Sequence, residues 1–119
     1  MSPPRTCEGL LIAYLNATLT GGVRAFGDVP AARPESFVTV ERTGGGCGRH
    51  WQDVLLAVGC WHTSRAKAAA LGEQVAALLV QAPAHVPRLA ATGVQSVYNL
   101  PDPDSGQARY QLTATATIY

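Results

Sequence analysis

Charged residues are scarce in this chain, at 14% of 119 residues, against about 25% in typical soluble domains. The formal net charge is +1, and Lys67 is the one lysine among nine basic residues. This balance excludes a polybasic tail, an acidic solvating tail and a simple disordered chain. Hydrophobic residues make up 47% of the sequence. We therefore expect one globular domain over residues 1–119, with part of its low-charge surface covered by other molecules.

Cysteines and long hydrophobic runs are also few. The three cysteines, Cys7, Cys47 and Cys60, are an odd number at irregular spacing, which argues against a disulfide framework and for folding in a reducing cytoplasm. No apolar stretch approaches the roughly 20 residues that span a bilayer. The first hydrophobic run is broken by Tyr14 and Asn16 and lacks a cleavage site. We expect neither a signal peptide nor a membrane partner.

Motifs for catalysis and cofactor binding are missing. No serine lies in a Gly-x-Ser-x-Gly context. The glycine-rich segment 44–49 lacks the Gly-Lys-Ser/Thr ending of a phosphate loop, and it follows a predicted strand without opening a helix. Asp102 and Asp104 are explained by turn capping rather than acid–base chemistry. The arginines form no patch in the sequence. We expect no enzyme activity, no cofactor and no sequence-specific binding of nucleic acid.

One pattern has the composition of a metal site. Cys47-x-x-His50 and Cys60-x-His62 could bind zinc tetrahedrally if the four side chains converged. The predicted strand 53–62 separates the two pairs at about 3.3 Å per residue. We therefore favour no metal, with Cys60 a small core residue and His62 a polar strand end. A small zinc-binding module remains an alternative.

Two helices are predicted from hydrophobic periodicity. The first spans 5–19 and has an apolar stripe of Leu11, Leu15 and Leu19 at every fourth position, with Pro3 and Pro4 before it and Gly21-Gly22 after it. The second spans 64–81 and opens with the capping pair Thr63-Ser64. Its alanines favour close approach to a sheet, and its apolar stripe consists of Leu71, Val75, Leu78 and Leu79.

Five strands are predicted, at 23–29, 36–43, 53–62, 92–100 and 109–119. Strand 53–62 is apolar on both faces, which indicates a central or covered strand. Strand 109–119 alternates between apolar residues and a row of threonines with Gln111. The glycine-rich segment 43–50 between two strands predicts a flexible hairpin tip over 43–51.

The element order is therefore α-β-β-β-α-β-β. We expect an α+β two-layer sandwich, in which two helices cover one face of a mostly antiparallel four- to five-stranded sheet. The other face carries the threonines, Gln111 and Arg42, and is either solvated or in contact with a neighbouring subunit. At the hairpin tip, Arg49 and His50 beside Trp51 are candidate partner contacts, and the alternative is a solvated tip.

Several phrases in this order resemble one known family. They are the N-terminal helix, FVTVERTGGG at 37–46, SRAKAAALGEQVAALL at 64–79 and PDPDSGQARYQLTATATIY at 101–119. Together they cover most of the chain and resemble the tail terminator (tail completion) proteins of long-tailed bacteriophages. A neighbouring family of small head–tail connector proteins is the alternative.

The resemblance implies structural work in a virion. Such proteins form a hexameric ring that caps the tail tube, ends its polymerisation and joins the tail to the head. The implied partners are further copies of the chain, the major tail tube protein, a head–tail connector or stopper protein, and genome DNA that passes through the lumen. The implied location is the head-proximal end of the tail, after assembly in the host cytoplasm. The candidate interface residues are Gly44, Gly45, Gly46, Arg49, His50, Trp51, Asp102, Asp104 and Arg109.

Overall fold

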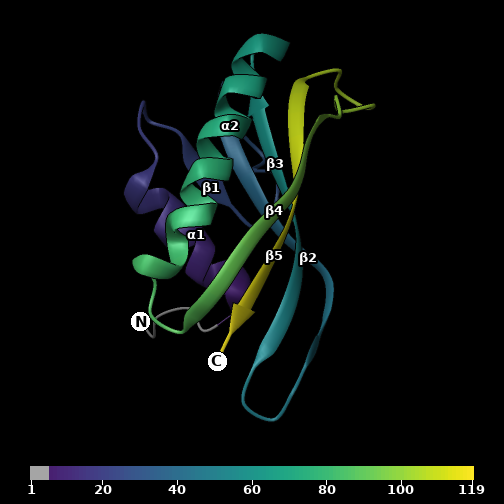
Figure 1. The fold of residues 1–119 in the computed structure, drawn as a ribbon. Helices are drawn as coiled ribbons and strands as arrows, with labels where there is room; N and C mark the ends of the chain where they lie inside the picture. The colour runs from purple at the N-terminus through teal and green to yellow at the C-terminus, as the bar shows by residue number, and fades with distance from the viewer. Residues whose placement is uncertain (1–5) are drawn as a thin grey trace.

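The structure is a computed structural model, and it describes residues 6–119. Its strands form one five-stranded sheet in the order β1-β2-β3-β5-β4, and the two α-helices cover one face (Figure 1). This confirms the predicted α+β class and element order. The elements are α1 (Cys7–Thr18), β1 (Arg24–Phe26), β2 (Phe37–Cys47), β3 (Gln52–His62), α2 (Arg65–Gln81), a 3-10 turn (Ala82–Ala84), β4 (Leu89–Asn99) and β5 (Ala108–Ile118).

The sheet is mixed, because β1 pairs with β2 in parallel while the other three pairings are antiparallel. The prediction of a mostly antiparallel sheet is thus confirmed, and the parallel pairing of β1 at its edge was not predicted. β1 is shorter than the predicted 23–29. The Asn16 side chain satisfies both backbone groups of Ala25, accepting from its N–H at 2.8 Å and donating to its carbonyl at 3.2 Å. A helix side chain therefore fixes the position of this edge strand.

Helix α1 begins at Cys7 because Thr6 caps it, with the Thr6 hydroxyl accepting from the Gly9 N–H at 3.0 Å. Leu11 and Leu15 of the predicted stripe are fully buried. The predicted start of this helix at residue 5, and the punctuation by Pro3 and Pro4, lie outside the described residues.

Helix α2 begins after Ser64, whose hydroxyl accepts from the Lys67 N–H, so the predicted cap is confirmed. Leu71, Val75 and Leu79 are buried, and Leu78 is half-buried. The expectation that the alanines at 66, 68, 69 and 70 approach the sheet was correct for Ala68, which is fully buried. Ala66 and Ala70 are exposed because they lie on the solvent side of the helix.

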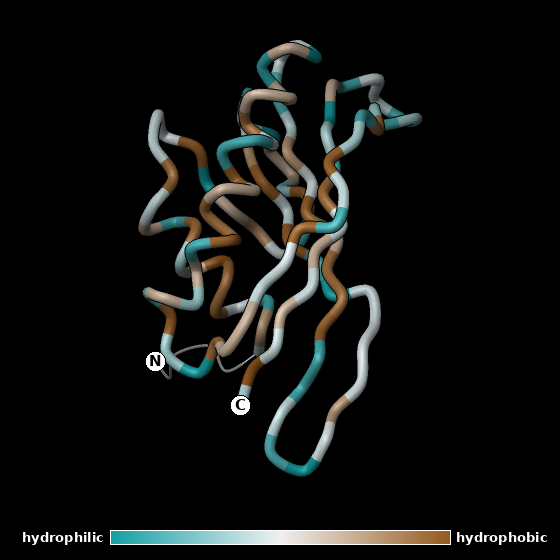
Figure 2. The backbone as a smooth tube through the Cα atoms, viewed as in Figure 1, coloured by the Kyte–Doolittle hydropathy of each residue, from teal (hydrophilic) through white to brown (hydrophobic). Residues whose placement is uncertain are grey.

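The core lies between the helices and the sheet, where apolar residues are concentrated (Figure 2). β5 alternates as predicted, with Leu112, Ala114, Ala116 and Ile118 buried in this core. The threonines of β5 lie on the opposite face, as expected. Arg42 does not, which corrects the prediction. It follows Val38 and Val40 in the strand alternation, so it lies on the helix side, where it lines a hollow with Cys7 and Glu8.

Strand β2 runs to Cys47, four residues beyond its predicted end, so the glycine-rich segment is paired strand rather than loop as far as Cys47. Gly44, Gly45 and Gly46 pair with Leu55, Val54 and Asp53 of β3. A bulge between Arg42 and Gly44 shifts the register. Gly45 has φ 112°, and a Cβ there would lie 2.0 Å from the Asp53 carbonyl oxygen. Glycine therefore permits this pairing, a role that composition alone does not reveal.

Candidate functional site

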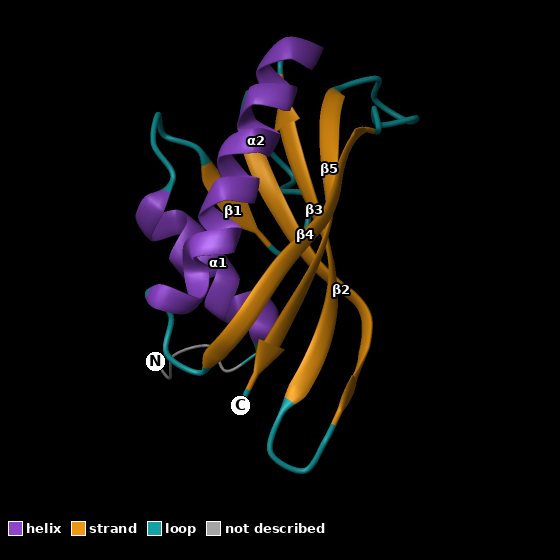
Figure 3. Ribbon diagram, in the orientation of Figure 1, coloured by secondary structure: helices purple, strands orange, loops and turns teal. Residues whose placement is uncertain are grey.

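The outer part of β2 and β3 forms an arm that extends beyond the helices (Figure 3). Only residues 48–51 connect the two strands. The Gly48 N–H donates to the Trp51 carbonyl at 2.7 Å and closes the tip. The Trp51 indole lies against Gly48, because a Cβ at position 48 would be 2.5 Å from Trp51 Cε2. The absence of a side chain at position 48 thus makes room for the indole.

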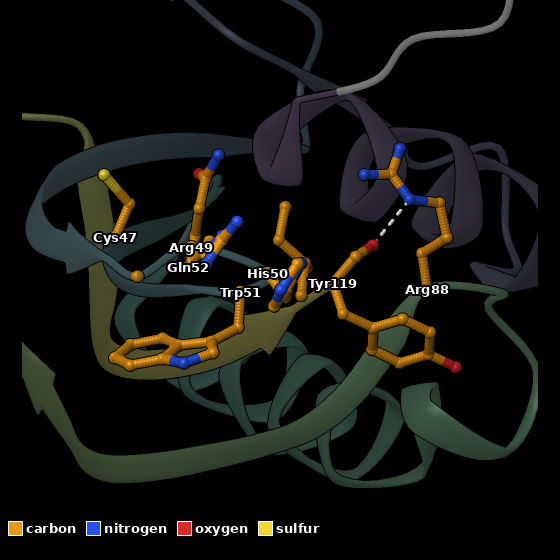
Figure 4. Close-up of a pocket in the computed structure, with 9 residues that line it drawn as sticks. Cys47, Arg49, His50, Trp51, Gln52, Arg88 and Tyr119 are labelled. Atoms are coloured by element: carbon orange, nitrogen blue, oxygen red, sulfur yellow. Dashed lines mark hydrogen bonds between the residues drawn. The ribbon is translucent and has the colours of Figure 1, made fainter.

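The tip borders a hollow of about 320 Å³. Figure 4 shows Trp51 and Tyr119 on opposite sides of it, with His50 between them. The two aromatic residues are 48% and 62% exposed, which is high for side chains of this size. The hollow is lined by Cys47, Gly48, Arg49, His50, Trp51, Gln52, Arg88, Ile118 and Tyr119. Three segments distant in sequence therefore build one surface, which we call the tip hollow.

The charged side chains that line the tip hollow are arginines. Arg49 and Arg88 are in its lining with His50, and that lining contains no aspartate or glutamate. Arg42 lies next to it and donates to the Gln52 amide oxygen at 3.2 Å. The nearby Asp53 carboxylate accepts from the Thr117 hydroxyl at 2.8 Å. These two residues pair directly across β3 and β5 on the face opposite the core, so that carboxylate is turned away from the hollow.

Arg88 has an unusual backbone. Its φ is 73°, the one positive value at a non-glycine residue among residues 6–119. Two hydrogen bonds to Tyr119 hold it there. The Arg88 Nε donates to the Tyr119 carbonyl at 2.7 Å, and the Tyr119 N–H donates to the Arg88 carbonyl at 3.0 Å (Figure 4). Sequence reasoning missed both residues, because no local motif signals a contact across 31 positions.

Asp102 organises the turn between β4 and β5. Its carboxylate accepts from the backbone N–H groups of Asp104 and Ser105 and from the Ser105 hydroxyl. It also forms an ion pair with Arg33 at 3.4 Å. The Ser105 hydroxyl, followed by the backbone N–H groups and Arg33, lowers the pKa of Asp102 to about 2 although partial burial opposes the shift. The predicted turn-capping role is confirmed. Asp102 is buried, and Asp104 beside it is exposed.

Arg109 belongs to a cluster on the sheet face opposite the helices. Its guanidinium lies over the Trp61 ring at 4.7 Å, and Arg33 lies over the same ring at 5.4 Å. Phe37 stacks on Trp61 with ring centroids 5.1 Å apart. The Arg109 Nε donates to the Leu100 carbonyl at 2.7 Å. This cluster connects the loop 27–36 to the turn at 100–107, and no local pattern in the sequence indicates the role of Arg33.

The nine candidate interface residues thus form two groups at opposite ends of the sheet. Gln52 pairs with Ile118 at the arm, whereas Trp61 pairs with Arg109 at the other end of the same two strands. The glycines, Arg49, His50 and Trp51 lie at the arm. Asp102, Asp104 and Arg109 lie at the turn. The structure therefore presents two separate surfaces on one chain.

The two Cys/His pairs are also far apart. Cys47 pairs with Gln52, and Cys60 lies eight positions further along β3, which is roughly 26 Å at the rise of a strand. Within residues 6–119, no group of three or more His, Cys, Asp or Glu is placed to hold a metal ion. Cys47 is exposed, while burial raises the pKa of Cys7 to about 11 and that of Cys60 to about 12. Neither α-helix described combines the length and apolarity needed to cross a bilayer.

Comparison with known proteins gives structural matches only. No protein-family model and no curated protein matches the chain. Twenty chains of solved structures match it. One belongs to the virion of a native gene transfer agent particle. It aligns with a TM-score of 0.58 and 15% identity over 94% of this chain and 86% of that chain. At this identity the match shows a shared fold.

Proposed function

We propose that the chain is a structural protein of a phage-like virion. In this role it caps the tail tube as a hexameric ring, ends tube polymerisation and provides the surface that joins tail to head. The observation that carries the proposal is the shared fold with a chain of a gene transfer agent virion, which extends over 94% of the sequence. The resemblance of its phrases to tail terminator proteins points the same way. The proposed activity is assembly, without catalysis or cofactor.

The two separate surfaces suit a ring. A ring closes through heterologous contacts, in which one patch on a subunit meets a different patch on the next. The described chain is elongated, with extents of 42 × 30 × 24 Å. The tip hollow lies at one end, and the turn with Asp104 and Arg109 lies at the other. We propose that these ends serve neighbouring subunits, the tail tube protein and the head–tail connector, while genome DNA passes through the lumen.

The proposal is tested by mixing the purified chain with assembled tail tubes from the same particle. Light scattering follows the mass of the chain alone, and negative-stain microscopy examines the tube ends. We expect sixfold rings at one end of each tube. Rings that bind the head connector and never a tube would instead identify a head–tail connector. A chain that binds neither component would contradict the proposal.

A further inference from the structure

The tip hollow combines features that a merely solvated hairpin does not need. Two large aromatic side chains remain exposed beside it, and the Trp51 indole lies against Gly48. Tyrosine and tryptophan side chains are enriched at protein contact sites. Arg88 keeps a positive φ, which is unfavourable for a bulky side chain and persists where surrounding contacts impose it. The two hydrogen bonds to Tyr119 account for this φ, so the exposed aromatic pair is the feature that indicates a contact surface.

The charges around the hollow indicate what the ligand carries. Arg49, His50 and Arg88 line it with no acidic residue among them. The Arg88 Nε donates to the Tyr119 carbonyl (Figure 4), and within residues 6–119 the two terminal nitrogens of its guanidinium form no hydrogen bond. A guanidinium presenting two parallel N–H groups matches a carboxylate in bidentate geometry. The Trp51 and Tyr119 rings lie alongside and offer apolar contact area.

We propose that the tip hollow binds an acidic segment of a partner protein, with a carboxylate on Arg49 and Arg88 and an aromatic side chain against Trp51 and Tyr119. This inference rests on the proposed function, since it names the chemistry of the partner that the arm meets during assembly. The proposed site contains Arg88 and Tyr119 in addition to the tip residues Arg49, His50 and Trp51 that were predicted from the sequence.

The arrangement favours a protein segment over a nucleic acid. Binding to a phosphate backbone requires cations spread along a stripe, so that several phosphates are neutralised at once. Here the two arginines Arg49 and Arg88 border one hollow of about 320 Å³. The formal net charge of the whole chain is only +1. A few carboxylates beside an apolar side chain match this size and charge.

The test measures fluorescence anisotropy of labelled probes with the purified full chain. The probes are a peptide of alternating glutamate and tyrosine, a peptide of alternating glutamate and glycine with equal charge, and an oligothymidylate of similar length. We expect both peptides to bind in a salt-dependent manner, the tyrosine peptide more tightly. Trp51→Ala should reduce the tyrosine peptide to the affinity of the glycine peptide.

Charge variants locate the site. The double variant Arg49→Gln with Arg88→Asn removes both guanidinium groups, and asparagine tolerates the positive φ at position 88. We expect a loss in peptide affinity of about tenfold or more. The matched control is Arg65→Gln, an exposed arginine at the start of α2, which should change affinity less than about twofold. Far-UV circular dichroism checks that each variant is folded.

Three results would overturn the inference. They are absence of saturable peptide binding, an equal loss in the Arg65→Gln control, and oligothymidylate binding that matches the peptide and weakens equally in the double variant. The binding assay uses the chain alone, whereas ring formation is scored on tail tubes. If the chain forms rings on tail tubes but binds no peptide, this inference fails and the proposed function stands. If it binds the peptide but forms no rings, the proposed function fails.

Discussion

At the residue scale, Gly59 shows how a single missing side chain shapes one face of the sheet. A Cβ there would lie 2.7 Å from Thr39 Oγ1 and 2.9 Å from Trp61 Nε1, the two atoms that form a hydrogen bond of 3.2 Å. We predict that Gly59→Ala lowers the free energy of unfolding by about 1–3 kcal/mol, because the ring must move. Gly46→Ala is the control, since nothing lies within 4 Å of its Cβ position. Urea unfolding measures the free energy of unfolding of both variants. Equal stability of the two would contradict the close packing of Thr39 and Trp61 against Gly59.

The three thiols should differ sharply in reactivity. The thiolate is the reactive form, and burial raises the pKa of Cys7 to about 11 and of Cys60 to about 12. Cys47 is exposed on the arm. We predict that a thiol reagent such as DTNB at pH 8 modifies one cysteine rapidly and the other two only as the chain unfolds. Cys47→Ser should remove the rapid phase. A second rapid thiol in that variant would contradict the burial of Cys7 or Cys60.

The Asp102 turn should make stability depend on acid pH. The pKa of this carboxyl falls from an ordinary value of 3.8 to about 2 on folding. A lowered pKa stabilises the folded state above about pH 4, and this contribution is lost as the pH falls from about 4 to 2. Asp102→Asn should therefore lower the melting temperature at pH 7, and the difference from the original chain should narrow towards pH 2.

Asp104→Asn is the matched control for this turn. Its residue is exposed, and no hydrogen bond to its carboxylate is formed within residues 6–119. We expect a melting temperature within a degree or two of the original at both pH values. A difference for Asp102→Asn that stays constant down to pH 2 would show that the carboxylate charge is not responsible.

Residue roles were predictable where the cause is local. The capping role of Asp102 follows from its own turn, and that of Ser64 follows from the start of its helix. Arg33, Arg88 and Tyr119 could not be found in this way. Their contacts join segments 31 or more positions apart in sequence, and no spacing rule relates such residues.

At the element scale, helix α2 carries much of the core. Leu71 is 5% exposed on its buried side, whereas Val80 is 60% exposed on the same helix. We predict that Leu71→Asp unfolds the domain, because it places an unpaired carboxylate in an apolar core. Val80→Asp should change stability by less than about 0.5 kcal/mol. Cooperative thermal unfolding of a soluble Leu71→Asp protein near the original melting temperature would contradict this.

The helices and longer strands were predictable because hydrophobic periodicity is a local signal that burial enforces. The arm was not. Glycine-rich sequence favours loops on average, yet here Gly45 adopts a φ of 112° that keeps β2 paired to β3. The parallel placement of β1 also escaped prediction, because it depends on Asn16 and on the path of the loop 27–36.

At the scale of the whole molecule, the structure shows where the apolar and uncharged residues of this low-charge chain lie. Most apolar residues lie in the core between the helices and the sheet (Figure 2). The open sheet face carries a row of small uncharged residues, among them Thr113, Thr115 and Ala57, beside the charged residues Glu41, Asp53 and Arg109. The threonine row within this face is compatible with the contacts that the proposed ring requires, because it holds no charge that would need to be desolvated.

The most direct measurement of the central claim is electron microscopy of particles made after deletion of this gene, with a plasmid copy as the complementation control. We predict filled heads and separate tails, with tail tubes of abnormal length. The plasmid copy should restore joined particles of uniform tail length. Complete particles with joined tails of normal length and unchanged titre in the deletion strain would contradict the claim that this chain ends the tail tube and joins it to the head.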